Sequence, residues 1–391
     1  MSSTPKFFHQ AMTGAPVLSG TVGSLIAILD ACLVNGFGLK TADSVTVAGG
    51  IATMNFSTGH SFEAHAIALV AGATPAGLNG EQRILSVTTN TATFATAAPD
   101  GTATGAITAK VAPLGWIKVY SGTNKAVYKP SAIEASGALL RVDDTGTTAA
   151  RVRMYEAMTD IDTGFNVAPT EATLAGGFHW WKSAAASTLA RDWVVFGDDR
   201  NVYVAPAPHS TAAVSIHTIY AFGDLDSYKS GDAFPGVLTG EIVAVATVSS
   251  GNAAAGAVGG NSMRLVRSHT GIGTSVLGDR RPVVGNPNVA SGVDSYLGGF
   301  PAPVNNGLFL TRIVVNQAPI SSNGPRGLLP GLLYVPQSGT VGGLFPRGAV
   351  VNGTGEFAGR KVYAVPQSNS SLTAAMGDGS AFFDLTGPWR N

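Results

Sequence analysis

Apolar and polar residues alternate with a period of two along most of this chain. Between residues 41 and 112, five runs alternate in this way: 44–47, 51–56, 84–88, 91–94 and 106–110. A period of two places successive side chains on opposite faces of a strand, and the Gly-Gly and Asn-Gly pairs between runs are typical of tight turns. The pattern predicts a small β-sandwich or β-barrel domain over residues 41–112.

Strand patterns continue after residue 113 and become richer in aromatic residues. Residues 193–204 predict a hairpin, and residues 361–365 with 381–386 predict a second hairpin near the end of the chain. Between the hairpins, residues 245–307 are rich in Gly, Ala, Asn and Ser and lack a clear period, which favours an insertion or a long loop. We therefore predict one or more larger β domains over residues 113–391, with an insertion at about 245–307.

Only one stretch of the chain has a convincing helical period. Within residues 21–34, Leu25, Leu29 and Leu33 recur at intervals of about one helical turn, and the Asn-Gly pair that follows supplies a stop signal. These three leucines share one apolar face. We predict a helix here and treat the three leucines as candidate interface residues.

Residues 1–20 carry Pro and Gly at intervals and have no helical period, so they predict an extended arm. Arms of this type are often ordered only against a neighbour, and we predict a docking unit over residues 1–40. Together with the strand patterns, the sequence predicts a mainly β fold. It consists of several small β-sandwich or barrel-like domains with one N-terminal helix and an extended N-terminal arm.

The composition limits the classes of function. The chain has 391 residues, including 50 Gly and 21 Pro; only 12 % are charged, and 24 Lys and Arg balance 24 Asp and Glu. A neutral chain with few charges repels copies of itself weakly, so it tolerates close packing in an assembly. The same balance argues against a nucleic-acid partner, because binding to phosphates needs a basic face.

Cysteine usage and the apolar runs add three expectations. Cys32 is the only cysteine, so no disulfide forms within the chain, and its apolar surroundings predict a small buried side chain. The longest apolar run, residues 25–34, contains Asp30 and is too short to span a bilayer. Residues 1–10 lack the apolar core of a secretory signal. We expect no membrane insertion, no cofactor and synthesis in a cytoplasm.

Few residues suggest chemistry. His60 and His65 flank Glu63, but a zinc-binding helix needs two His four residues apart, and here the spacing is five. The segment therefore favours a turn over a metal site. Three acidic pairs lie beside Gly or Thr: Asp143-Asp144, Asp160 with Asp162, and Asp198-Asp199. We predict turns at these pairs, with Ca²⁺ binding and a glycosidase-like pair of carboxylates as the alternatives.

Trp180 and Trp181 are adjacent aromatic residues in a predicted strand. Adjacent side chains in a strand point to opposite faces, so we expect one indole in the core and the other free for a subunit interface or a glycan. Both are candidate interface residues.

Several stretches resemble a family of tailed-bacteriophage virion structural proteins. These are GAPVLSG at 14–20, SGTNKAVY at 121–128, FGDLDSYKSGDA at 222–233, LLPGLLY at 328–334 and FDLTGPWR at 383–390. The resemblance implies a virion protein that is made in the cytoplasm of a host bacterium and has itself and other virion proteins as partners. It supplies no catalytic residue, and we expect no enzymatic activity.

Three functions are consistent with these observations. The first is a structural protein of the tail or tail tip (baseplate) that assembles as a symmetric oligomer. The second is a capsid decoration or cement protein, whose arm would bridge neighbouring capsomers. The third is a module on the particle surface that binds a receptor or a host-surface glycan, for which Trp180 or Trp181 would supply the stacking surface.

Overall fold

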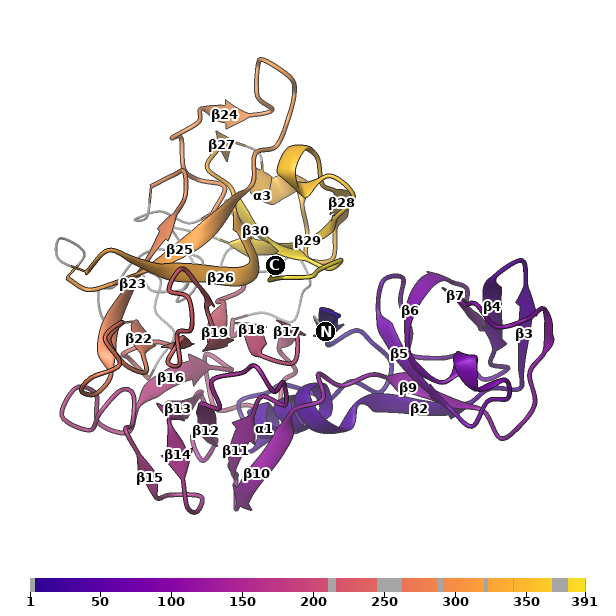
Figure 1. Ribbon diagram of the computed structural model, residues 1–391, viewed down its shortest axis with the longest axis horizontal. Helices are drawn as coiled ribbons and strands as arrows, with labels where there is room; N and C mark the ends of the chain where they lie inside the picture. Colours follow the sequence, from indigo (N-terminus) through magenta and orange to yellow (C-terminus); the bar gives the residue numbers. More distant parts are fainter. Residues whose placement is uncertain are drawn as a thin grey trace.

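The computed structural model of the chain describes residues 4–209, 216–244, 262–286, 291–319, 323–339, 341–367 and 379–390. The prediction of a mainly β fold is confirmed: 44 % of residues lie in strands and 7 % in helices, and one of the several sheets is a half-barrel. No helix in the described ranges is both long enough and apolar enough to cross a bilayer. Figure 1 shows a small lobe standing beside a larger body.

The lobe, residues 37–111, is one eight-stranded sheet with the order β2-β9-β5-β6-β7-β4-β3-β8. Alternate apolar side chains of its strands, such as Val45, Val47 and Phe94, point inward and are buried. Phe37 on the first strand lies opposite Val111 on the last. The strands are β2 (Phe37–Thr41), β3 (Ser44–Ala48), β4 (Ile51–Asn55), β5 (Ile67–Ala71), β6 (Gly80–Val87), β7 (Thr91–Ala95), β8 (Gly101–Thr102) and β9 (Thr108–Val111), with the short helix η2 (Ala76–Leu78).

The body contains a five-stranded antiparallel sheet with the order β10-β11-β12-β13-β16. Its strands are β10 (Ile117–Gly122), β11 (Lys125–Lys129), β12 (Leu139–Asp143), β13 (Ala149–Tyr155) and β16 (Phe178–Trp181). The short pair β14 (Ala157–Met158) and β15 (Gly164–Phe165) extends from it.

A thirteen-stranded sheet forms the rest of the body, with the order β1-β17-β18-β19-β21-β22-β23-β25-β26-β30-β29-β28, and with β20 paired to β26. Both predicted hairpins are confirmed, because β17 pairs with β18 and β29 pairs with β30, each antiparallel. The strands are β1 (Lys6–His9), β17 (Asp192–Gly197), β18 (Asn201–Ala207), β19 (Tyr220–Asp224), β20 (Asp226–Ser227), β21 (Gly236–Thr239), β22 (Met263–Leu265), β23 (Val276–Pro282), β25 (Thr311–Gln317), β26 (Pro325–Tyr334), β28 (Val350–Asn352), β29 (Lys361–Gln367) and β30 (Gly379–Asp384).

Four further short elements lie in the described part of the body. The strands β24 (Gly299–Phe300) and β27 (Ser338–Gly339) pair in parallel, and the helices are α3 (Val341–Leu344) and η3 (Gly355–Phe357).

The prediction of an insertion at 245–307 is wrong for part of that range. Strands β22 and β23 belong to the thirteen-stranded sheet, where Met263 and Leu265 are buried. A strand of three residues gives too short an apolar run to stand out among Gly and Ser, so the pattern did not reveal it. Residues 245–261 and 287–290 lie outside the described residues.

Of the predicted extended arm over residues 1–20, residues 6–9 form a strand and residues 10–14 form turns, and the strand pairs with its own chain. Strand β1 lies antiparallel to β17, with Lys6 opposite Gly197, and the side chains of Phe7 and Phe8 are buried. The prediction of a separate docking unit over residues 1–40 is therefore wrong: Phe7 packs against Tyr363 of the body with ring centroids 5.4 Å apart, and Phe8 packs against Phe37 of the lobe at 6.1 Å.

The predicted helix is present but shorter and less regular. The helix α1 (Ser24–Leu29) continues as a π-helical turn, η1 (Asp30–Asn35). It begins after Gly23, whose φ of 77° is left-handed and cannot belong to an α-helix. The helix packs beside β10 and β11, where the Asp30 carboxylate accepts hydrogen bonds from Tyr128 Oη at 2.7 Å and Lys118 Nζ at 2.9 Å (Figure 1).

Candidate functional site

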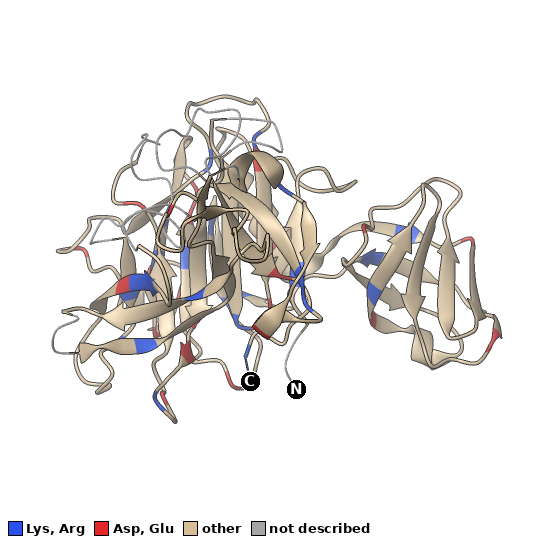
Figure 2. Ribbon diagram, turned by 90° about the horizontal axis from the view of Figure 1, so that it is seen from above, with Lys and Arg blue, Asp and Glu red and all other residues tan. Residues whose placement is uncertain are grey.

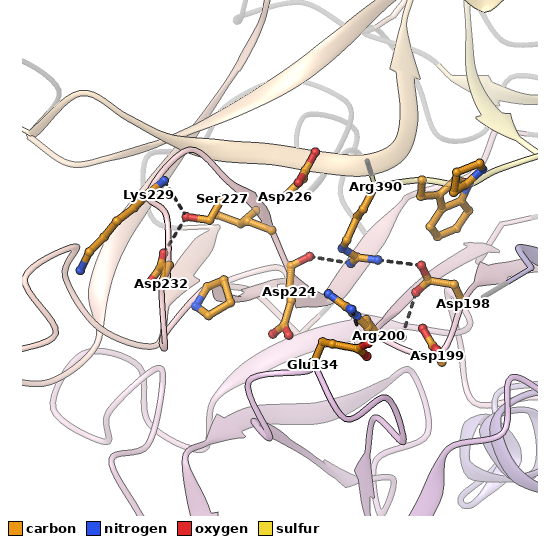
Figure 3. Close-up of a pocket in the computed structure, with 14 residues that line it drawn as sticks. Glu134, Asp198, Asp199, Arg200, Asp224, Asp226, Ser227, Lys229, Asp232 and Arg390 are labelled. Atoms are coloured by element: carbon orange, nitrogen blue, oxygen red, sulfur yellow. Dashed lines mark hydrogen bonds and ion pairs between the residues drawn. The ribbon is translucent and has the colours of Figure 1, made fainter. Parts of the chain in front are cut away.

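A cleft of about 540 Å³ in the body gathers charged side chains from distant parts of the chain (Figure 3). Six carboxylates and three cations line it, so its formal charge is negative although the whole chain is neutral. We call it the acidic cleft. Its charged residues are Glu134, Asp198, Asp199, Asp224, Asp226, Asp232, Arg200, Lys229 and Arg390.

Asp198 connects the β17–β18 turn to the C-terminal segment. Its Oδ1 accepts hydrogen bonds from the backbone N–H groups of Arg200 at 2.9 Å and Asn201 at 2.7 Å, which fixes the tight turn. Its Oδ2 accepts a hydrogen bond from Arg390 Nη1 at 2.7 Å. The same carboxylate therefore closes a hairpin and holds the end of the chain against the cleft.

Asp224, at the end of β19, is nearly inaccessible to solvent. Its carboxylate accepts two hydrogen bonds from Ser136, one from the backbone N–H at 2.7 Å and one from Oγ at 2.5 Å. Burial raises the pKa of this carboxyl, because loss of water destabilises the charged form more than the Ser136 donors stabilise it. Its backbone carbonyl accepts a hydrogen bond from Arg390 Nη2 at 2.9 Å, so Asp224 and Asp198 hold one guanidinium between them.

Asp232 is the most firmly paired carboxylate of the acidic cleft. Arg326 binds it in a bidentate manner, with Nε to Oδ2 and Nη2 to Oδ1 both at 2.9 Å, and both side chains are almost fully buried. Burial by itself would raise the pKa of Asp232, but the donors Arg326, Ser227 and the N–H of Phe234 outweigh it and hold the pKa below its usual value.

Trp389 adds an aromatic surface at the edge of the acidic cleft. Its Nε1 donates a hydrogen bond to the carbonyl of Asp384 at 2.8 Å, and its ring meets Tyr203 edge-on with centroids 5.9 Å apart. Gly331 lies against the ring so closely that a Cβ there would be 2.2 Å from Cε2. The indole also lines a second, smaller cavity that shares Asp226 with the acidic cleft, so the two hollows meet at this ring.

This arrangement suits a polar ligand with hydroxyl groups. Carboxylates accept and guanidinium groups donate hydrogen bonds in fixed planar geometry, and an indole offers a flat surface on which apolar C–H groups stack. Among the residues that the structure describes, no group of three or more His, Cys, Asp or Glu side chains is placed to hold a metal ion.

The five candidate interface residues all lie inside the chain. Leu25, Leu29, Leu33, Trp180 and Trp181 each have 0 % exposed surface. The three leucines face the body, so the helix face that we predicted for a neighbour is already covered. These positions cannot contact another subunit in this structure, which corrects the interface prediction.

The prediction that one of the two tryptophans is free is also wrong. Trp180 stacks on Tyr220 with centroids 5.7 Å apart and donates Nε1–H to the carbonyl of Thr239 at 2.8 Å. Trp181 donates Nε1–H to the carbonyl of Val243 at 2.9 Å. Strand β16 is covered on both faces by other parts of the body, so the alternation of its side chains does not lead to solvent.

The other candidate groups are separated in the structure. His60 lies between the carbonyls of Thr88 and Thr91, each 3.0 Å from its Nε2, whereas Glu63 hydrogen-bonds His9 Nε2 at 2.8 Å. The segment has no regular secondary structure, and His65 has a left-handed φ of 71°. His60, Glu63 and His65 do not converge on one point.

The acidic pairs also go to different places. Asp144 is buried against Lys182, and Asp162 binds Lys125 and Arg141 at the surface, while Asp198 and Asp199 join the acidic cleft. The sequence analysis identified Asp198 and Asp199 as a turn and missed the cleft. Its members lie between residues 134 and 390 and share no motif; the only local signal was the acidic stretch at 222–233.

Two comparisons with known proteins give no relative. No protein-family model matches the chain, and no curated protein matches it.

Proposed function

We propose that the protein is a structural component of a tailed-bacteriophage virion, placed in the tail or tail tip and assembled as a symmetric oligomer with other virion proteins. The observation that carries this proposal is the combination of a mainly β fold with a chain of which only 12 % of residues are charged. Figure 2 shows that Lys, Arg, Asp and Glu occupy only short stretches of the ribbon in both the lobe and the body, and that most of the ribbon carries other residues. Surfaces of this kind suit extensive contact with repeated neighbours.

Exposed apolar side chains support the same proposal. Ile133 and Val304 are 98 % and 94 % exposed, and Ile272 is 77 % exposed. Such side chains gain free energy when a neighbouring protein covers them. They replace the buried leucines and tryptophans as the positions at which we expect subunit contacts.

The location is tested by quantitative mass spectrometry of purified phage particles separated into heads and tails. Enrichment in tails supports the proposal. Enrichment in heads at high copy number would instead assign the protein to capsid decoration, and absence from both fractions would contradict a virion role.

A second function, binding of a host-surface glycan, is favoured by the acidic cleft and Trp389. The excess of carboxylates disfavours acidic sugars, so the ligand class is a neutral or amino hexose. Titration of envelope polysaccharide against the isolated protein, followed by tryptophan fluorescence, tests this function. Trp389→Ala should abolish saturable binding, whereas Tyr296→Ala, at a side chain 67 % exposed outside the acidic cleft, should leave it unchanged. Equal polysaccharide binding by both variants would exclude the acidic cleft as the glycan-binding site.

A further inference from the structure

Lys182 and Asp144 form an ion pair that is completely enclosed by protein. Neither side chain has any exposed surface. Asp144 directly follows β12 and Lys182 directly follows β16, and β13 lies between these two strands in the sheet. The two residues are 38 positions apart in the chain. The pair therefore joins two ends of one sheet in a place that water does not reach.

The hydrogen bonds around the pair are specific for each atom. Asp144 Oδ1 contacts Lys182 Nζ. Asp144 Oδ2 accepts hydrogen bonds from the backbone N–H groups of Leu25 at 2.8 Å and Ile26 at 3.3 Å. Lys182 Nζ also donates a hydrogen bond to the carbonyl of Thr21 at 2.6 Å. One carboxylate oxygen is thus held by two donors, and the other faces only the amine.

Burial favours the neutral form of both side chains. It raises the pKa of Asp144 and lowers the pKa of Lys182, although the attraction between the two groups opposes each change. Removing two charges from water is unfavourable, and a buried ion pair offsets this cost only when its geometry and its further hydrogen bonds are favourable. Transfer of one proton from Lys182 Nζ to Asp144 Oδ1 within this contact gives a carboxylic acid beside a free amine, which are an electrophile and a nucleophile.

We propose that Lys182 Nζ and Asp144 Cγ condense in the folded protein to an isopeptide bond that cross-links the end of β12 to the end of β16. This cross-link is independent of the function proposed above.

The reaction needs no reagent beyond the two side chains. The nitrogen lone pair of Lys182 attacks Cγ of Asp144, the Cγ–Nζ bond forms, and the Cγ–Oδ1 bond breaks. Oδ1 leaves as water with the carboxyl proton and one proton from the amine, so the oxidation state of every atom is unchanged. The N–H groups of Leu25 and Ile26 polarise the Cγ–Oδ2 bond and stabilise negative charge on Oδ2 during attack. The fixed contact supplies the proximity that favours condensation over hydrolysis.

The product fits the hydrogen bonds that are already present. Oδ2 becomes the amide oxygen and keeps its two donors, Leu25 and Ile26. The remaining Nζ–H donates to the carbonyl of Thr21, as the amine does now. Only the ionic contact is replaced, and the enclosed site loses both of its charges.

The test is the mass of the intact, natively purified protein measured after denaturation. The cross-linked chain is lighter than its sequence by the mass of one water molecule. Proteolytic mapping then locates the link: trypsin does not cleave after Lys182, and one branched peptide contains both Asp144 and Lys182. A wild-type protein with the full sequence mass would overturn the proposal.

Two variants provide the controls. Lys182→Arg keeps a positive charge beside Asp144 but removes the nucleophilic amine, so its mass should equal its full sequence mass. Lys118→Met removes the ion pair with Asp30, whose Nζ–Oδ2 distance is 2.9 Å and whose side chains are partly exposed, and it should keep the loss of water. A loss of water that persists in Lys182→Arg would place the modification elsewhere and would refute the assignment, and the wild-type mass decides the question even if this variant fails to fold.

Discussion

Strand β1 gives a direct test of how the N-terminus contributes to stability. The change is Phe8→Ala. Phe8 has 0 % exposed surface, and its ring lies 6.1 Å from the ring of Phe37. Truncation of a buried phenylalanine to alanine costs about 3–5 kcal/mol, because apolar contact is lost and a cavity remains. We expect a loss of about 4 kcal/mol in the free energy of unfolding of the body.

Guanidinium unfolding followed by tryptophan fluorescence measures this loss. All five tryptophans lie outside residues 37–111, so the signal reports on the body and not on the lobe. Trp193 is on β17, the strand that pairs with β1. The matched control is Val17→Ala, since Val17 is also near the N-terminus but is 55 % exposed, and it should change stability by less than about 0.5 kcal/mol. A loss of less than about 1 kcal/mol for Phe8→Ala would show that the arm is not an integral strand of the body.

Three further predictions concern buried groups. Leu29→Asp places a charge on the buried helix face and should cost about 3 kcal/mol or more, seen as a lower melting temperature; an unchanged one would contradict this burial. Arg326→Met leaves Asp232 buried without its cation and should cost about 3–5 kcal/mol by denaturant unfolding, whereas a neutral effect would mean that the pair adds nothing. Burial, followed by repulsion from Arg151, lowers the pKa of His179 from 6.5 to about 4. The unfolded chain therefore binds more protons between these values, and stability falls as the pH falls through this window. His179→Gln should reduce that fall. If the wild type and His179→Gln lose the same free energy of unfolding between pH 6.5 and pH 4, the prediction is refuted.

The period-two pattern predicted much of the fold because most strands of the lobe are half-buried. Residues 44–47 and 51–56 alternate cleanly, and they form β3 and β4 with one face inward. The pattern was less informative for β16, whose four residues are all buried. A strand that is covered on both faces has no polar side, so its sequence does not say which side chain meets a neighbour.

The acidic cleft could not be predicted for a different reason. Glu134, Asp198 and Arg390 come together only because the loop between β11 and β12, the β17–β18 turn and the C-terminal segment meet in space. The spacing of residues within one segment does not indicate contacts between segments that are far apart in the sequence. The Lys182–Asp144 pair is similar: Asp143-Asp144 was visible as an acidic pair, but nothing in its neighbourhood points to a lysine 38 residues later.

The attachment of the lobe has a consequence for how this protein can diversify. Phe37 and Val111, on the first and last strands of the lobe, lie directly opposite each other. An insert whose two ends are neighbours can be removed or exchanged with little effect on the surrounding chain. Strand β1 is an edge strand of the thirteen-stranded sheet and pairs with β17, and the lobe contributes no strand to this sheet. Residues 37–111 therefore form a unit that enters and leaves the body at one place. A replacement lobe would have to keep the contact of Phe37 with Phe8 and a hydrogen-bond partner for the carbonyl of Leu385, which Arg83 Nη1 now contacts at 2.8 Å.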